Sequence, residues 1–161
     1  PVFINEHELM YNMKGEVPDG EYFHPLEGSE IVRPGRDVTL LGYNISVYWC
    51  MQAAEQLAKE GIEAEVIDLY ALSPLDRAGI KRSVSKTHRA VVVEEAEAPV
   101  GVGAEVIAII NEECFFDLDA APVRVSAANV PMPYNHGLEK AAIPSAKRVV
   151  ETVRQMLGVK G

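Results

Sequence analysis

The sequence predicts a three-layer α/β fold, in which a mainly parallel sheet lies between two layers of helices. Apolar segments of strand length alternate with segments of helical periodicity along most of the chain. The strand segments are continuously apolar, which is typical of parallel strands covered on both faces. The chain has 161 residues, of which 48% are hydrophobic and 24% charged, so one domain with a packed core is expected.

The expected elements follow a regular order after the first third of the chain. Residues 1 to about 37 carry turn and loop signals, rich in Gly and Pro. Short apolar strands are expected at 38–42, 64–69, 90–94 and 122–126. Helices are expected from about 50 to a stop at Gly61, from Ser73 to about Lys86, through 106–110, and over 145–157. Ser73 is assigned as a helix cap because Pro74 follows it and Asp76 lies three residues further on.

Composition and charge exclude several classes of protein. The chain has 24 acidic and 15 basic residues, a net charge of −9, and no basic stripe, so no nucleic-acid partner is expected. The acidity fits either a basic protein partner or simply a soluble surface. No run of about 18 apolar residues is present, and residues 1–5 lack the features of a signal peptide. Cys50 and Cys114 are isolated, so we expect buried free thiols in a reducing compartment.

Ligands of parallel sheets bind beyond the carboxyl ends of the strands. The loops that follow the predicted strands are 42–46, 70–74, 94–103 and 126–135. In one of them, Gly101 and Gly103 allow two interpretations: a phosphate cradle in a flavodoxin-like nucleotide binder, or a tight turn with close helix packing. The second is favoured because four acidic residues nearby would repel an anion: Glu94, Glu95, Glu97 and Glu105.

Acidic side chains give two further candidates. The run from Glu94 to Glu97 allows a general base or a metal ligand, but no partner at ligand spacing joins it, so a solvated or interfacial loop is favoured. Asp117 and Asp119 follow Phe115-Phe116 and indicate either a plain connector or a docking patch. No histidine falls near a serine or cysteine in a nucleophile motif. The residues alone therefore predict no self-contained active site.

Ordered strings of sequence carry a family resemblance over nearly the whole chain. They are EHELMYN at 6–12, IVRPG at 31–35, EVIDL at 65–69, LSPLD at 72–76, SVSKTHR at 83–89, VEE at 93–95, GVGAE at 101–105, APVRV at 121–125 and VPMPY at 130–134. With these strings the chain resembles the C-terminal half of the beta subunits of thiamine-diphosphate-dependent 2-oxoacid dehydrogenases, pyruvate dehydrogenases in particular. It departs from them at Tyr70, where arginine is usual, and at 96–100, which replaces a Thr-Gly-Gly type of loop.

The resemblance implies a transketolase C-terminal-like domain over 31–161, with a mixed sheet of about five strands. Residues 1–30 would be the last strand of a missing N-terminal domain, at 2–4, followed by a linker. That missing domain would supply the glutamate that activates the cofactor, and an alpha subunit would bind thiamine diphosphate and Mg²⁺. The resemblance therefore implies no catalytic, cofactor-binding or metal-binding residue in this segment, which alone would be inactive.

The implied role is subunit assembly and docking to the acyltransferase core during oxidative decarboxylation of pyruvate to acetyl-CoA. Partners would be the N-terminal beta domain, the alpha subunit, a second beta subunit and the small basic subunit-binding domain of the acyltransferase, in the cytoplasm or the plastid stroma. Alternatives are a branched-chain 2-oxoacid or acetoin dehydrogenase and a stand-alone interaction module. The residues assigned to partner docking are Asp117, Asp119 and Gly161, and those assigned to subunit interfaces are Gly101, Val102, Gly103, Pro131, Met132, Pro133 and Tyr134.

Overall fold

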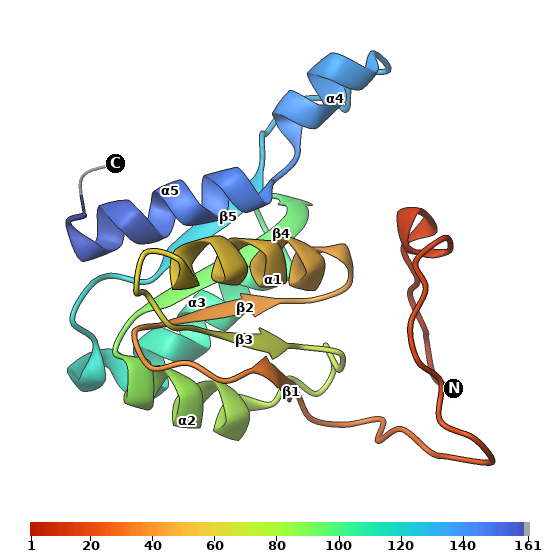
Figure 1. The fold of residues 1–161 in the computed structure, drawn as a ribbon, viewed down its shortest axis with the longest axis horizontal. Coiled ribbons are helices and arrows are strands. Elements are labelled where there is room, and N and C mark those ends of the chain that lie inside the picture. Colours follow the sequence, from red (N-terminus) through yellow and green to blue (C-terminus); the bar gives the residue numbers. More distant parts are fainter. Residues whose placement is uncertain (160–161) are drawn as a thin grey trace.

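A five-stranded mixed sheet organises the molecule, which a computed structural model describes over residues 1–159 (Figure 1). The strands are β1 (Glu30–Arg33), β2 (Val38–Gly42), β3 (Ala64–Asp68), β4 (Ala90–Glu97) and β5 (Val123–Ala127). Their order in the sheet is β1-β3-β2-β4-β5, and every pairing is parallel except that of β1 with β3. The predicted α/β class and mixed sheet are confirmed.

Helices cover both faces of the sheet and create two hydrophobic cores. The helices are α1 (Ile45–Ala58), α2 (Arg77–Thr87), α3 (Val102–Cys114), α4 (His136–Ala142) and α5 (Ala146–Leu157). Helices α1 and α5 pack together on one face, where Leu40, Leu57 and Val153 are fully buried. Helices α2 and α3 cover the other face, around Leu41 and Ile80. Successive side chains of β2 thus enter opposite cores, as the two-residue period of a strand requires.

The start of α2 differs from the predicted one. Asp76, not Ser73, caps this helix, and the Asp76 carboxylate accepts a 2.8 Å hydrogen bond from the Gly79 amide. The acidic residue that was assigned to the first turn is therefore itself the cap, and the helix begins three residues later than expected. Ser73 and Pro74 instead belong to a turn in which Leu72 and Leu75 form an isolated bridge.

Three other elements differ from the sequence prediction. Strand β1 lies inside the turn-rich first third, and α4 follows the proline-rich loop directly. Strand β4 continues to Glu97, three residues beyond its predicted end.

Both predicted buried thiols, Cys50 and Cys114, are confirmed as buried and free. None of the helices within residues 1–159 combines the length and the apolar character needed to cross a membrane.

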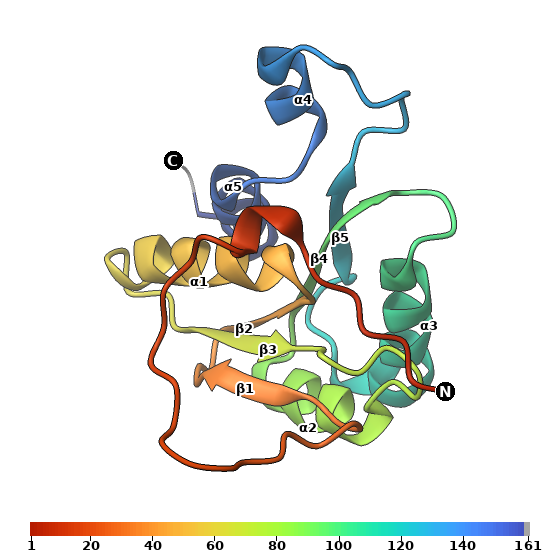
Figure 2. The same cartoon turned by 90° about the vertical axis from the view of Figure 1, so that its right-hand side faces the viewer.

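Two segments extend beyond the layered body on the side of the strand carboxyl ends (Figures 1 and 2). One is an arm, residues 1–29, whose regular structure is the short 3₁₀ helix η1 (Glu8–Met10). The other is a lobe, residues 128–145, which contains α4. The residues predicted as the last strand of a preceding domain, 2–4, form no strand and are 66–91% exposed. The division of the chain at about residue 30 remains a prediction.

Candidate protein interface

The arm, the lobe and the loop after β4 present many exposed apolar side chains. On the loop and lobe, Val100 and Tyr134 are fully exposed, and Met132 and Leu138 are more than half exposed. The arm contributes Phe3, Val17, Tyr22, Phe23 and Leu26, among others. Exposed apolar side chains that gather on one side of a protein are typical of interaction sites, so we name the side formed by the arm, the lobe and this loop the apolar face.

The apolar face lies where the strand order reverses. The chain proceeds from β2 to β3 on one side and returns to β4 on the other, so the connections that follow these paired strands run to opposite sides of the sheet. Tyr43 follows β2, and its hydroxyl donates to the Glu94 carboxylate of β4 at 3.5 Å. Burial, together with the adjacent Glu94 charge, raises the pKa of Tyr43 to about 12, so its phenol stays protonated at neutral pH.

The acidic run after the third predicted strand is only partly solvated. Glu94 is fully buried within β4, so the interpretation of the run as a solvated or interfacial loop is wrong for this residue. Glu95 is half-buried and its carboxylate lies 2.8 Å from His7 Nε2 of the arm, whereas Glu97 is exposed. In the part of the chain that the structure describes, no group of three or more potential metal ligands converges. The sequence analysis named Glu94 but missed its burial, although its place at the end of the valine-rich predicted strand favoured an inward-facing side chain.

The glycines at 101 and 103 fit a tight turn better than a phosphate cradle. Gly103 is in the first turn of α3, and its amide donates to the Glu94 carboxylate at 2.7 Å. A carboxylate of the protein therefore occupies the place that an anionic ligand would need. Of the predicted interface residues, Gly101 and Val102 are partly exposed, whereas Gly103 is buried.

A second surface carries the predicted docking residues. The short 3₁₀ helix η2 (Phe115–Asp117) follows α3 and exposes both Phe115 and Phe116. Asp119 is half exposed, lines a groove of about 510 Å³ beside these rings, and pairs with Arg89 at 2.7 Å. Asp117 is turned inward and accepts a 2.5 Å hydrogen bond from the Ser85 hydroxyl. The third predicted docking residue, Gly161, lies outside the described residues.

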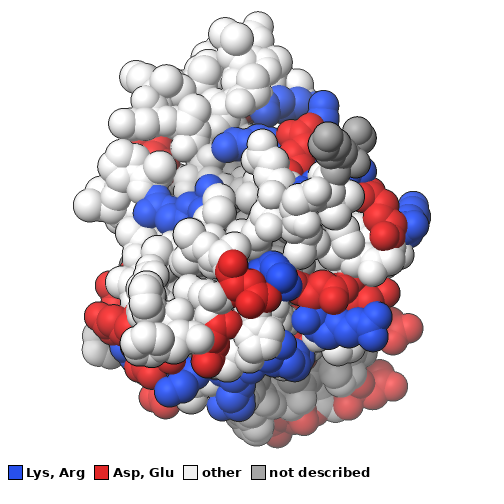
Figure 3. Space-filling model, turned by 90° about the vertical axis from the view of Figure 1, so that its left-hand side faces the viewer, with Lys and Arg blue, Asp and Glu red and all other residues white. Residues whose placement is uncertain are grey.

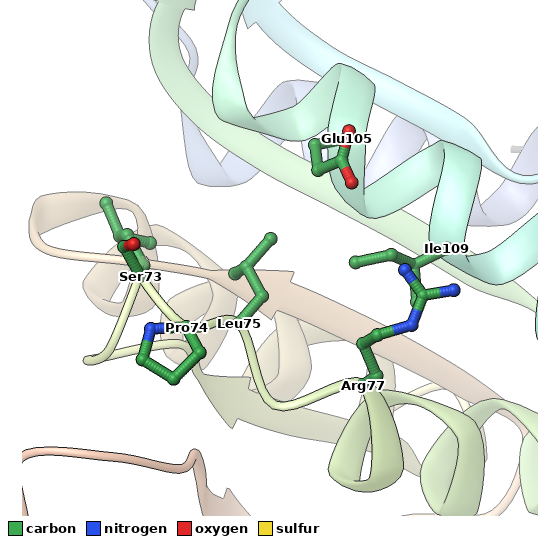
Figure 4. A pocket seen from close by; sticks show the side chains of 7 residues that line it. Ser73, Pro74, Leu75, Arg77, Glu105 and Ile109 are labelled. Atoms are coloured by element: carbon green, nitrogen blue, oxygen red, sulfur yellow. The ribbon is translucent and has the colours of Figure 1, made fainter.

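A small cleft separates the loop before α2 from α3 (Figure 4). It has a volume of about 290 Å³, and Leu72, Leu75 and Ile109 form its apolar wall. Arg77 projects from one side, but its guanidinium already pairs with Glu112 and Glu113 at 2.6 and 3.1 Å. Ser73 and Glu105 also line the cleft, and no histidine, cysteine or lysine is among the described residues that line it.

Charge on the opposite side of the molecule is mixed. In Figure 3, which views the side away from the arm, Lys and Arg side chains are interspersed with Asp and Glu. The described residues visible there form no continuous basic stripe. The expectation that the chain has no nucleic-acid partner remains a prediction.

Tyr70, where the resembling family usually has arginine, holds the end of the arm. Its hydroxyl donates to the Glu27 carbonyl at 2.8 Å, and its ring packs edge-on against His24 with centroids 4.5 Å apart. Gly28 adopts φ +113°, and a Cβ atom there would lie 2.8 Å from the Tyr70 hydroxyl. The substitution therefore has a structural role at the junction between arm and domain.

The order of helices and strands defines an α/β domain built on a mixed five-stranded sheet. A family model described as "Transketolase, C-terminal domain" matches residues 28–149, and the chain belongs to that family. Its relatives include "Pyruvate dehydrogenase E1 component subunit beta" of Gracilaria tenuistipitata var. liui, which is 45% identical over 157 residues, 98% of this chain and 49% of the relative. The resemblance found in the sequence analysis is thereby confirmed.

Two further relatives extend this comparison to organelles. The mitochondrial pyruvate dehydrogenase E1 component subunit beta of Dictyostelium discoideum is 42% identical over 160 residues, covering 97% of this chain and 45% of the relative. The chloroplastic subunit beta-3 of Arabidopsis thaliana is 42% identical over 156 residues, covering 97% and 38%. The chain thus spans half or less of the length of these relatives.

Solved structures confirm the fold. A split-gene transketolase, described as an inactive beta4 tetramer, matches with a TM-score of 0.73 and 29% identity, over 92% of this chain and 47% of that chain. A 2-oxoglutarate:ferredoxin oxidoreductase from Magnetococcus marinus matches with a TM-score of 0.53 over 80% of this chain and 19% of that chain. At 15% identity, the second match concerns the fold alone.

Proposed function

We propose that this chain forms the C-terminal domain of a pyruvate dehydrogenase beta subunit, and that it supplies subunit interfaces and partner docking instead of reacting groups. The observation that carries the proposal is the apolar face at the carboxyl ends of the strands. Val100, Tyr134 and the arm side chains expose hydrophobic surface that another protein chain would bury. The similarity to pyruvate dehydrogenase beta subunits over 97–98% of the chain supports the choice of enzyme.

The proposed partners on the apolar face are the N-terminal beta domain, an alpha subunit and a second beta subunit. The predicted interface residues Pro131 to Tyr134 lie in the lobe. The lobe contributes the exposed side chains of Met132, Tyr134 and Leu138 to the apolar face. The segment Gly101 to Gly103 lies at the start of α3, next to the exposed Val100. The description of the related split-gene transketolase beta assembly as inactive supports the proposal that this segment alone has no activity.

The proposed docking site for the acyltransferase core is the η2 groove with Asp119. Its exposed phenylalanines and carboxylate suit a small partner with basic and apolar side chains, and the net charge of −9 would favour its approach. Asp117 and Gly161 belong to the same proposal. Support is greater for Asp119, whose side chain is half exposed, than for Asp117, whose carboxylate is turned inward and bonded to Ser85.

We propose that thiamine diphosphate and Mg²⁺ are bound by the rest of the assembled enzyme, where the cofactor would supply the carbanion chemistry of decarboxylation. The residues described here contribute no converging set of metal ligands to such a site. The proposed compartment is the cytoplasm or the plastid stroma; relatives carry mitochondrial and chloroplastic names.

Reconstitution tests this function. The chain is mixed with an alpha subunit and the N-terminal beta half, each taken from a relative, in the presence of thiamine diphosphate and Mg²⁺. With an artificial electron acceptor added, oxidative decarboxylation of pyruvate is expected only when all parts are present. Turnover by the chain alone would contradict the proposal. A preference for branched-chain 2-oxoacids or acetoin would mean that the assembled enzyme acts on those compounds instead of pyruvate. Failure of every combination to associate would favour a stand-alone interaction module.

A further inference from the structure

Glu94 is a buried carboxylate whose partners come from three different parts of the fold. It has no exposed surface and lies within β4, three residues before the end of that strand. Its carboxylate accepts hydrogen bonds from the Gly103 amide at 2.7 Å and the Ser126 hydroxyl at 3.0 Å. Tyr43 adds a longer hydrogen bond at 3.5 Å. Burying a carboxylate is unfavourable unless it is paired and hydrogen-bonded, so this arrangement needs all of its partners.

Arg124 of β5 supplies the opposite charge. Its Nε atom lies 3.2 Å from Glu94 Oε1, a distance of ion pairing without hydrogen-bond geometry. The same guanidinium donates through Nη2 to the Ala98 carbonyl in the loop after β4. Arg124 therefore holds the loop from 98 to 101 at its first residue, and Glu94 holds the turn that follows it through the Gly103 amide.

The backbone of this loop is shaped around the Glu94 side chain. A Cβ atom added to Gly101 would lie 2.6 Å from a Glu94 carboxylate oxygen, and one added to Gly103 would lie 2.5 Å from the other. Between the two fixed points, Val100 adopts φ +54°, which is rare for a β-branched residue, and its side chain is fully exposed. The structure thus maintains a strained backbone that presents an apolar side chain to solvent.

The second predicted interface segment is connected to the same carboxylate through β5. Ser126, which donates to Glu94, is the penultimate residue of β5, and the Ser126 carbonyl accepts from Arg148 at 3.0 Å. The base of the lobe is then closed by a hydrogen bond from the Ala128 amide to the Ala142 carbonyl at 2.8 Å. The lobe that carries Pro131 to Tyr134 therefore emerges from a point that Glu94 fixes.

We propose that Glu94 is a positioning residue of the apolar face, which holds the Gly101–Gly103 turn and the start of the lobe in one fixed arrangement for partner binding. This inference rests on the proposed interface function. It assigns the role to a residue that contacts no partner itself and acts through Gly103, Ser126 and Arg124.

The first test measures amide hydrogen exchange in the isolated chain. Glu94→Ala is expected to speed exchange of the Gly103 amide at least tenfold, because that amide loses its acceptor. Glu97→Gln is the matched control, since Glu97 is an exposed carboxylate of the same strand. Exchange at Gly103 that is unchanged in Glu94→Ala would overturn the proposal.

A rescue experiment separates positioning from a general loss of stability. Gly103→Ala places a methyl group against the Glu94 carboxylate, and the nearest atoms that it meets all belong to Glu94. In the Glu94→Ala background that conflict disappears. We expect Gly103→Ala to lower the melting temperature of the otherwise unchanged chain but to have little effect in Glu94→Ala. An equal drop in melting temperature in both backgrounds would contradict the close contact between Gly103 and the Glu94 carboxylate.

The last test measures association with the alpha subunit and the N-terminal beta half. Glu94→Gln and Glu94→Ala are expected to weaken it at least tenfold. Val84→Ala, a fully buried change on α2, serves as a control for lost stability and should leave association intact. Wild-type affinity in Glu94→Ala would refute the positioning role. If the unchanged chain does not associate at all, the proposed function fails, and the exchange measurement still decides whether Glu94 holds the turn.

Discussion

Asp76 shows how a single side chain fixes where an element begins. Its carboxylate accepts from the Gly79 amide at 2.8 Å and from the Ser29 hydroxyl at 2.7 Å, so it joins the first turn of α2 to the end of the arm. Partial burial alone would raise the pKa of Asp76, but these hydrogen bonds and the charge of Arg82 outweigh it and hold the pKa below its usual value. The ionised carboxylate therefore stabilises the folded chain.

We predict that Asp76→Ala lowers the free energy of unfolding by about 1 kcal/mol at neutral pH, the usual effect of losing a helix cap. Because the folded-state pKa is depressed, the carboxylate contributes fully above the unfolded-state pKa of about 3.9 and loses its contribution as the pH falls through the folded-state value. The difference between wild type and variant should shrink below about pH 4. Urea unfolding at several pH values measures this difference in the free energy of unfolding. A difference that grows on acidification would contradict the assignment of Asp76 as an ionised helix cap.

Tyr70 makes the second prediction at the scale of a residue. Tyr70→Phe keeps the ring against His24 but removes the hydrogen bond to the Glu27 carbonyl, with an expected loss of about 1 kcal/mol of local stability. Limited proteolysis should cut residues 20–28 several times faster, while the core remains intact. Unchanged cleavage would mean that the hydroxyl does not hold the arm.

At the scale of elements, the buried and exposed leucines of two helices should behave in opposite ways. Leu57 of α1 is fully buried, whereas Leu138 of α4 is 60% exposed. We predict that Leu57→Ala lowers the free energy of unfolding by about 2–5 kcal/mol. Leu138→Ala should change it by less than about 0.5 kcal/mol yet weaken association with the alpha subunit and N-terminal beta half. Denaturant unfolding and a binding titration check both; a large stability loss in Leu138→Ala would show that α4 belongs to the core.

The elements whose presence and type the sequence predicted correctly are those with strong periodicity, although the bounds of β4 differ. The valine-rich β4 and the amphipathic α5 carry enough apolar residues in one pattern to identify them. Strand β1 has only four residues and lies at the sheet edge among turn signals, and α4 has seven residues and mostly exposed side chains. Such short elements depend on tertiary contacts, which local sequence does not reveal.

The dependence on tertiary contacts also limits what the sequence shows of the candidate site. The residues of the interface segments follow from the resemblance and from their place after predicted strands. The role of Glu94 does not, because it depends on Arg124 and Ser126 of a neighbouring strand. An acidic run such as Glu94–Glu97 is usually solvated, and only the sheet pairing decides which carboxylate turns inward.

At the scale of the whole molecule, two surfaces have different predicted partners. The apolar face is assigned to the subunits of the dehydrogenase, and the η2 groove to the acyltransferase core. We predict that Asp119→Asn weakens binding of a basic subunit-binding domain about tenfold without changing association on the apolar face, because Asp119 is half exposed and lines only the groove. Isothermal titration in low and moderate salt measures this. Equal binding by wild type and variant would remove Asp119 from the docking site.

The most direct test of the account is the sedimentation of the unmodified chain, alone and together with an alpha subunit and an N-terminal beta half. If the apolar face is a subunit interface, the chain should move entirely into a complex that contains all three components. A chain that sediments identically with and without them would contradict the claim that this domain acts through assembly.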